Sequence, residues 1–208
     1  MPTARGWLVL AGALLGLAAA VLHFLDPFLS VSRPVAAEAL IVEGWLPDYA
    51  LRDAVAEFRR GHYKYIIASG RTLPAHWLGS RFKSAADAAA AVLSAYGLET
   101  NQVVAVAPLE DRQDRTYTSA LAVRAWLEQS HPSLRAVNVY SLGPHARRTW
   151  LLYQKALGDK VRVGIIAHPD DDFDPKRWWK SSDGFSEVVG EGIAYLYARV
   201  LFHPAPPR

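Results

Sequence analysis

The chain opens with an apolar segment that has the length and composition of a membrane-spanning helix. Residues 6–25 read GWLVLAGALLGLAAAVLHFL and carry no formal charge. Twenty helical residues rise about 30 Å, which matches the hydrocarbon thickness of a bilayer. Trp7 lies near one end of the segment, and Phe24 and Phe28 lie near the other, where aromatic side chains meet the headgroups. The sequence therefore predicts a transmembrane anchor within residues 1–30.

Two other interpretations of this segment remain open. A cleaved signal peptide would use Arg5 as its charged start and the alanines 18–20 as its cleavage site, although its apolar region is usually shorter. A buried core helix would carry a polar stripe, and His23 is the only polar side chain between residues 6 and 25. An uncleaved anchor fits the segment best.

The charges around the segment predict its orientation. Arg5 precedes it, whereas Asp26, Arg33 and Glu38 follow it and do not form a positive flank. Because positive charge is retained on the cytoplasmic side, we expect a cytoplasmic N-terminus and an extracytoplasmic domain.

The composition excludes several classes of protein. Of the 208 residues, 51% are hydrophobic and 21% charged, a globular balance without the signature of disorder. The absence of cysteine excludes disulfides, thiol catalysis and thiolate metal sites. The net charge is only +3 and the basic residues are scattered, so no nucleic-acid partner is expected. Such a charge suits an anionic small molecule or an anionic lipid headgroup.

Short apolar runs alternate with helical patterns after the first segment. Each run is β-branched or otherwise apolar and too short for a helix, which predicts strands. The expected strands are residues 39–43, 65–69, 103–107, 136–141 and 161–167. Helical spacing of apolar residues lies between them, as in Leu51, Val55 and Phe58 before Gly61, and a last helix is expected at 187–201.

Strict alternation of strands and helices predicts parallel strands joined by right-handed crossovers. The expected fold class is α/β: a Rossmann-like, doubly wound, mostly parallel five-stranded sheet preceded by one N-terminal transmembrane helix. The anchor would be followed by a linker at residues 31–37, the α/β domain at 38–202 and a proline-rich tail at 203–208.

Ligands of doubly wound sheets bind beyond the carboxyl ends of the strands, near the reversal of strand order. Four loops are expected there, at residues 43–45, 69–71, 112–118 and 141–148. Their glycines allow close backbone approach, and their arginines, hydroxyls and following helix N-termini suit an anion. The candidate ligand-binding residues are Gly44, Ser69, Gly70, Arg71, Arg115, Thr116, Thr118, Ser141, Gly143, Arg147 and Arg148.

The same residue types also end strands, cap helices or lie in solvent. For any single loop, such a purely structural role is the alternative to ligand binding. The convergence of four loops on one sheet edge favours a ligand site.

Two residues are candidates for chemistry. His145 enters a helix in the fourth loop, where it is expected to act as an acid, a base or a phosphate contact, or to pack and cap the helix. Glu43 ends the first strand and is the one well-placed carboxylate in the four loops. It is expected to act as a general base, as a metal ligand or as the partner of an arginine.

Residues 167–171, Ala-His-Pro-Asp-Asp, resemble the signature of zinc-dependent deacetylases acting on amino sugars. In that family the motif follows the first strand and a later His-x-x-His supplies further ligands, whereas here it follows the last strand and only His203 lies downstream. We therefore expect no zinc site, and an acidic loop at residues 170–174.

Four segments together resemble the ElyC/SanA/YdcF family over residues 39–201. They are Glu43-Gly44 before a helix with Arg52, residues 65–70 (YIIASG), residues 114–120 (DRTYTSA) and residues 141–147 (SLGPHAR). Trp45 replaces the family's second glycine, Thr118-Ser119 replaces its Glu-Asn pair, and Arg148 holds its usual spacing from His145 better than Arg147 does.

The resemblance adds Arg52 to the candidate ligand-binding residues. It implies a Rossmann-like domain in the bacterial plasma (inner) membrane, linked to envelope biogenesis and peptidoglycan-precursor or lipid-carrier metabolism. It implies no particular cofactor or reaction. A hydrolase or transferase acting on an anionic, phosphate- or nucleotide-bearing ligand or lipid-linked precursor is expected, and a non-catalytic binding or regulatory module is the alternative. A methyltransferase-like cofactor binder is disfavoured, because no Gly-x-Gly-x-x-Gly follows the first strand.

Overall fold

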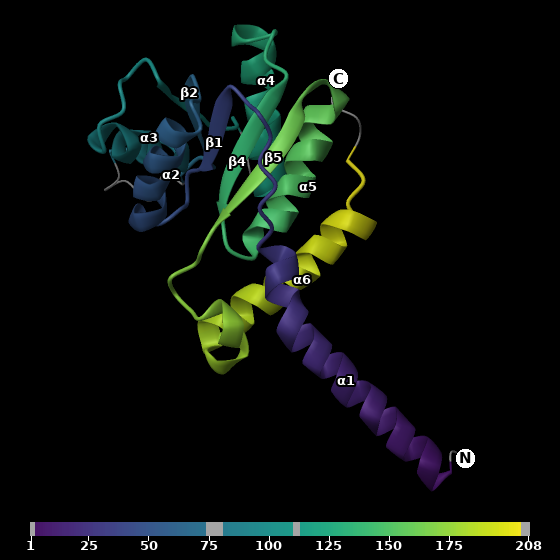
Figure 1. Cartoon of the computed structure of the whole chain (residues 1–208). Helices are drawn as coiled ribbons and strands as arrows, with labels where there is room; N and C mark the ends of the chain where they lie inside the picture. Colours follow the sequence, from purple (N-terminus) through teal and green to yellow (C-terminus); the bar gives the residue numbers. More distant parts are fainter. Residues whose placement is uncertain (1–2, 74–80, 110–112, 205–208) are drawn as a thin grey trace.

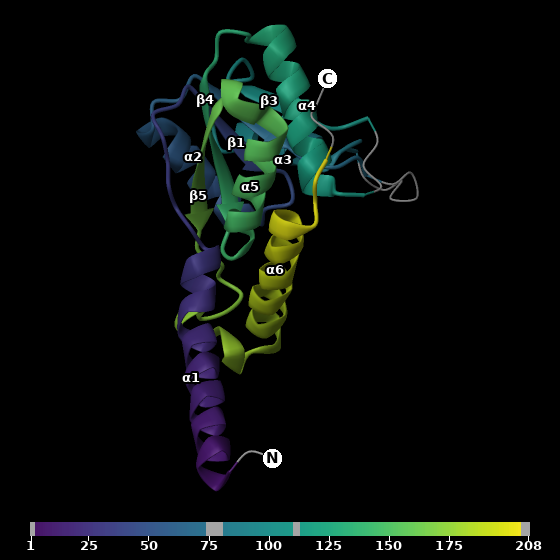
Figure 2. The ribbon, with the colours of Figure 1, turned by 90° about the vertical axis from the view of Figure 1, so that its right-hand side faces the viewer.

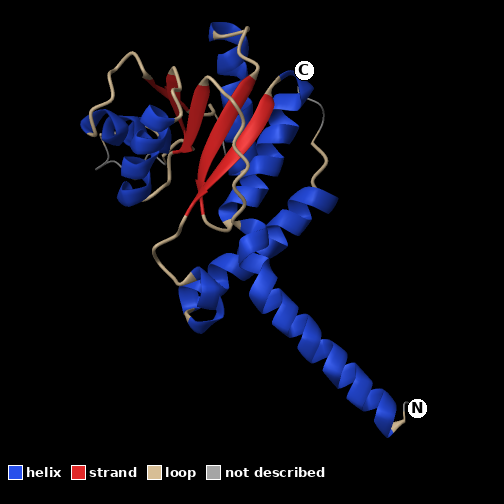
Figure 3. Cartoon of the chain, in the orientation of Figure 1, coloured by secondary structure: helices blue, strands red, loops and turns tan. Residues whose placement is uncertain are grey.

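The strands form one sheet in which every neighbouring pair is parallel. A computed structural model describes residues 3–73, 81–109 and 113–204, and its sheet has the order β3-β2-β1-β4-β5 (Figure 3). The strands are β1 (Ala39–Glu43), β2 (Tyr65–Ser69), β3 (Val103–Val106), β4 (Ala136–Leu142) and β5 (Arg162–His168). The α/β class and the predicted strands are confirmed, with ends that differ by at most one residue. Strand order reverses between β1 and β4.

Helices cover both faces of the sheet (Figures 1 and 2). The helices are α1 (Ala4–Leu29), α2 (Asp48–Arg60), α3 (Ala85–Ala95), α4 (Arg115–Ser130), α5 (His145–Leu157) and α6 (Ser182–Val200), with 3-10 turns η1 (Gly158–Lys160) and η2 (Pro175–Lys180). Leu40 and Val42 of β1 pack with α2 and α3, whereas Ile41 packs with α4 and α5. Successive side chains of a strand point to opposite faces of the sheet. Because helices cover both faces at β1, the residues of this strand that point to either face are apolar.

Helix α1 projects away from the α/β domain (Figure 1). It is long and apolar enough to cross a membrane, and its most apolar window is not buried by the rest of the chain. Only its C-terminal end packs on the domain, where Leu22, Leu25 and Leu29 meet Trp178 of η2. The Trp178 Nε1–H donates to the carbonyl of Leu22 at 3.1 Å. The predicted apolar helix is therefore confirmed, and its end is fixed to the domain.

The segment predicted as a linker, residues 31–37, is attached to the sheet. Arg33 pairs with Ile165 of β5 through two backbone hydrogen bonds of 2.7 and 3.1 Å. Asn138 of β4, 1% exposed, accepts from the Val35 N–H at 2.9 Å and donates to the Val35 carbonyl at 2.8 Å. The same amide lies 2.8 Å from the Tyr63 hydroxyl. One buried amide thus fixes the chain between α1 and β1. The predicted tail is described only as far as Pro204.

We predict that Asn138→Ala lowers the free energy of unfolding by about 1–2 kcal/mol, since half-buried backbone groups of Val35 would lose their partner. Chemical denaturation of the detergent-solubilised chain measures this change. The matched control is Asn101→Ala at an exposed turn, which should leave the free energy of unfolding within about 0.5 kcal/mol of the parent. Equal effects of the two substitutions would contradict this role of Asn138.

Candidate functional site

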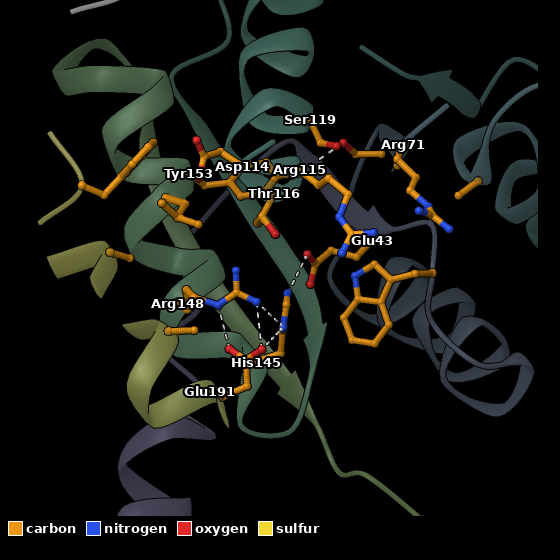
Figure 4. A pocket seen from close by; sticks show the side chains of 18 of the residues that line it. Glu43, Arg71, Asp114, Arg115, Thr116, Ser119, His145, Arg148, Tyr153 and Glu191 are labelled. Carbon is orange, nitrogen blue, oxygen red and sulfur yellow. Dashed lines mark hydrogen bonds and ion pairs between the residues drawn. The ribbon is translucent and has the colours of Figure 1, made fainter. Parts of the chain in front are cut away.

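A cavity of about 600 Å³ lies at the carboxyl ends of β1 and β2, beside the reversal of strand order between β1 and β4. The first turns of α4 and α5 and one side of α6 complete its wall (Figure 4). This is the position at which doubly wound sheets bind ligands. The candidate residues that line it are Glu43, Ser69, Gly70, Arg71, Arg115, Thr116, His145 and Arg148.

Glu43 is a buried carboxylate at the end of β1, only 4% exposed. It accepts hydrogen bonds from the Ser141 hydroxyl and from Thr149 Oγ1, the latter at 3.3 Å. Burial by itself would raise the pKa of Glu43, but the charge of His145 and the hydrogen bond from Ser141 lower it below the ordinary value. Glu43 is therefore ionised at neutral pH.

His145 lies between two carboxylates, one on each side of its ring. Its Nδ1 is 2.9 Å from Glu191 Oε1 of α6, and its Nε2 is 3.5 Å from Glu43 Oε1. The second distance is that of an ion pair and is long for a hydrogen bond, so the buried Nε2 has no hydrogen-bond partner among the described residues. Burial by itself would lower the pKa of His145, but the two carboxylates raise it to about 9. His145 is thus an imidazolium at neutral pH.

Arg148, one turn after His145 on α5, balances the second carboxylate. It donates to both oxygens of Glu191, from Nε at 2.7 Å and from Nη2 at 2.8 Å. Such paired bonds fix the planes of both groups. Burial by itself would raise the pKa of Glu191, but the hydrogen bonds from Arg148 and His145 lower it to about 2. Glu43, His145, Glu191 and Arg148 therefore form a chain of alternating charges, which we call the buried charge chain (Figure 4).

Two further arginines line the cavity without ion-pair partners in the described part of the chain. Arg71 follows β2 and Arg115 begins α4, and neither takes part in a salt bridge there. Arg115 extends into the cavity on the side of Glu43 (Figure 4). Thr116 shares this first turn of α4, whose free backbone N–H groups favour an anion.

Three predicted ligand-binding residues lie outside the cavity lining and support the elements that form it. Ser141 is fully buried and holds Glu43. Gly143 has a φ of +40° and lies against Asp170, where any other residue would be strained. At Gly44, a side-chain Cβ would lie 2.7 Å from the Ala85 carbonyl, so glycine allows the start of α3 to approach.

The other three predicted residues contact different parts of the molecule. The Arg147 guanidinium lies 3.8 Å from the centre of the Phe28 ring and donates to the Phe28 carbonyl, which ties α5 to α1. Arg52 pairs with Asp53 at 3.2 Å on an exposed part of α2. Thr118 donates to the carbonyl of Arg115 at 3.0 Å, within α4. None of these three lines the cavity.

Sequence reasoning missed the contribution of α6 to the site. Glu191 completes the buried charge chain, and Glu187 lines the cavity one turn earlier. Burial raises the pKa of Glu187, and the nearby charge of Glu191 raises it further. Two glutamates four residues apart among the apolar residues of the middle of α6 were the available signal.

One cluster of potential metal ligands occurs in the described residues. One ligand atom each of His145, Glu187 and Glu191 lies within 4.8 Å of the others. Arg148 and the His145 N–H already occupy the Glu191 carboxylate, so a cation would have to displace both. The ring nitrogens of His168, in the deacetylase-like motif, contact Asp53 and the Pro169 carbonyl. The Glu191 carboxylate is therefore not free to bind a metal ion in this arrangement.

We predict that the buried charge chain makes stability depend on pH above neutrality. The folded pKa of His145, about 9, exceeds the unfolded value of about 6.5. Its stabilising contribution is therefore complete below about pH 6.5 and disappears as the pH rises through about 9. The melting temperature of the parent should exceed that of His145→Gln by more at pH 6 than at pH 10. The control His62→Asn, at an exposed turn, should show a constant difference.

Comparison with known proteins places the chain in no family. No protein-family model matches it, and no curated protein matches it. The resemblance to the ElyC/SanA/YdcF family therefore stays a prediction that depends on the four short segments alone.

Proposed function

We propose that this chain is a membrane-anchored protein of the bacterial envelope that binds a phosphate-bearing anion in the cavity and acts on it as a hydrolase or transferase. The ligand would be a small molecule, a nucleotide or the headgroup of a lipid-carrier intermediate. The observation that carries the proposal is the position of His145, held between two carboxylates in a cavity that also displays two arginines without ion-pair partners among its described residues.

Recognition of the anion rests on Arg71, Arg115 and the first turn of α4. The charges of Arg148 and His145 are balanced by Glu191 and Glu43, whereas those of Arg71 and Arg115 are not balanced by an ion pair among the described residues. Guanidinium groups bind phosphate through paired hydrogen bonds, and a helix N-terminus adds backbone donors and a favourable dipole. These groups offer one phosphate several charge-assisted contacts.

The Nε2–H of His145 is the proton that such a ligand would have to reach, because Glu191 occupies Nδ1 and Nε2 lies buried against Glu43 without a hydrogen bond. In a hydrolysis, the oxygen of water would form a bond to phosphorus while the bond from phosphorus to the leaving oxygen breaks. His145 would give its proton to the leaving oxygen, and Glu187 would take the proton released by water. Glu43 and Glu191 would act as positioning residues, because they hold the ring and its charge without needing to contact the ligand.

A non-catalytic binding or regulatory module is the second candidate, and one observation favours it. Glu43, the base predicted from the sequence, is already occupied by Ser141, Thr149 and His145. If Glu187 does not act as a base either, the cavity would bind an anion without transforming it.

The location proposed for this activity is the outer side of the bacterial inner membrane. The support is the length and apolar surface of α1 and the single positive charge, Arg5, at its N-terminal end. The resemblance to envelope proteins in the segments around Glu43 and His145 agrees with this location.

We predict that Arg115→Ala weakens the binding of inorganic pyrophosphate by about 10-fold or more, since one charge-assisted contact would be lost. Isothermal titration of the detergent-solubilised full chain measures the affinity. Arg52→Ala is the matched control, because Arg52 lies outside the cavity. Equal weakening by both substitutions, or no binding to the parent, would overturn the proposed anion site.

We predict that Glu187→Gln abolishes turnover while changing the pyrophosphate affinity by less than about 3-fold, since the substitution keeps the size of the side chain and removes only its basicity. Phosphate release from nucleoside diphosphates and from a prenyl pyrophosphate in micelles measures turnover. A parent chain that binds pyrophosphate but releases phosphate from none of these compounds would favour the binding module.

A further inference from the structure

Helix α6 carries an apolar stripe on its outer side. Its exposed members are Phe185, Ile193, Leu196 and Val200, and Val189 in the same row is half-buried against the cluster of Leu29 and Trp178. Successive members are three or four residues apart, so they share one side of the helix. Phe185 is 53% exposed, Ile193 65%, Leu196 61% and Val200 60%. An apolar stripe of this kind marks a surface that meets an apolar partner.

The charged residues of α6 lie away from the stripe. Glu187 and Glu191 line the cavity together with Ala194 and Ala198. The other two are Asp183, in the first turn, and Arg199, in the last. At 100° per residue neither falls within the arc of the stripe. One helix therefore has the cavity on one side and a stripe without charge on another.

The position of α6 relative to α1 indicates what covers the stripe. Leu25 and Leu29 of α1 lie beside Gly192, and the Phe28 ring lies 5.6 Å from that of Tyr195. Figure 1 shows α6 running across the end of α1, with the sheet on one side and the long free part of α1 on the other. A helix that crosses another in this way lies along the membrane surface when its neighbour spans the bilayer. Leu25 is the last residue of the uncharged segment, so α6 crosses α1 at the expected headgroup level.

The turn before α6 has the side chains typical of a membrane surface. In η2, Lys176, Arg177, Trp179 and Lys180 are exposed, and the Trp178 indole is bonded to the backbone of Leu22 in α1. Lysine and arginine attract anionic headgroups, and tryptophan prefers the headgroup region. These residues therefore lie beside α1 at the level where it would leave the bilayer.

We propose that α6 is an interfacial helix whose apolar stripe is inserted into the surface of the bilayer that α1 crosses. This inference rests on the proposed membrane anchoring. It also narrows the class of ligand. The cavity is then separated from the lipid only by α6, which is about 10 Å thick. A ligand with a phosphate-bearing headgroup and a membrane-embedded tail fits this position. A free soluble phosphate would need no such arrangement.

Cysteine labelling tests the proposal directly, because the chain contains no cysteine. Leu196→Cys and Ile193→Cys each carry a nitroxide on the stripe, Leu14→Cys reports on α1, and Glu128→Cys on exposed α4 is the control. The full chain is reconstituted in vesicles of phosphatidylethanolamine and phosphatidylglycerol. Collision rates with oxygen, which concentrates in lipid, and with a polar nickel chelate, which stays in water, then report the surroundings of each label.

We expect the labels at 193, 196 and 14 to collide mainly with oxygen and the label at 128 mainly with nickel. High nickel collision at 193 and 196, with the label at 14 in lipid, would overturn the interfacial helix and leave the membrane anchor intact. Low collision with both reagents at 193 and 196 would show a protein partner such as a second copy, and would also overturn it. Nickel access at 14 as well would overturn the anchoring itself.

Discussion

The site depends on the ion pairs that the buried imidazolium of His145 makes with its two neighbouring carboxylates. A charged ring inside a protein is stable only when opposite charges lie against it, and here Glu43 of β1 and Glu191 of α6 do so on its two sides. Arg148 then balances Glu191, and Ser141 and Thr149 hold Glu43. The sheet, α5 and α6 are joined by this one network. Removal of any one of the four charged side chains would leave a buried charge without its partner.

Helix α6 connects the cavity of the domain to the apolar helix α1. A doubly wound sheet with α2 to α5 would already have a crevice at the reversal between β1 and β4. The addition of α6 closes one wall of that crevice and supplies Glu187 and Glu191. It also contacts α1 near Leu25 and Leu29, so the helix that forms one wall of the cavity also holds the C-terminal end of the apolar helix. Arg147 strengthens this junction through the Phe28 ring.

Much of the fold was predictable because it depends on local pattern. Runs such as residues 39–43 and 65–69 are apolar, short and followed by glycine, and parallel sheets bury both sides of a strand. The place of the cavity followed from topology, and Glu43, Arg115 and His145 were found there as expected. The linker was less predictable. Nothing local in residues 31–37 reveals that Asn138, a hundred residues later, would fix them to the sheet.

The sequence by itself determined an apolar helix, an alternating β/α domain and the loops at one edge of its sheet, since these follow from spacing and hydrophobicity along the chain. Only the tertiary structure decided which charges meet. Glu191 and His145 are 46 residues apart, and their contact depends on how α6 turns back over α5. That contact, with Glu43 on the other side, raises the pKa of His145 to about 9, so the ring carries a proton at neutral pH. Burial and neighbouring charge set this property, and neither is a feature of the sequence near His145.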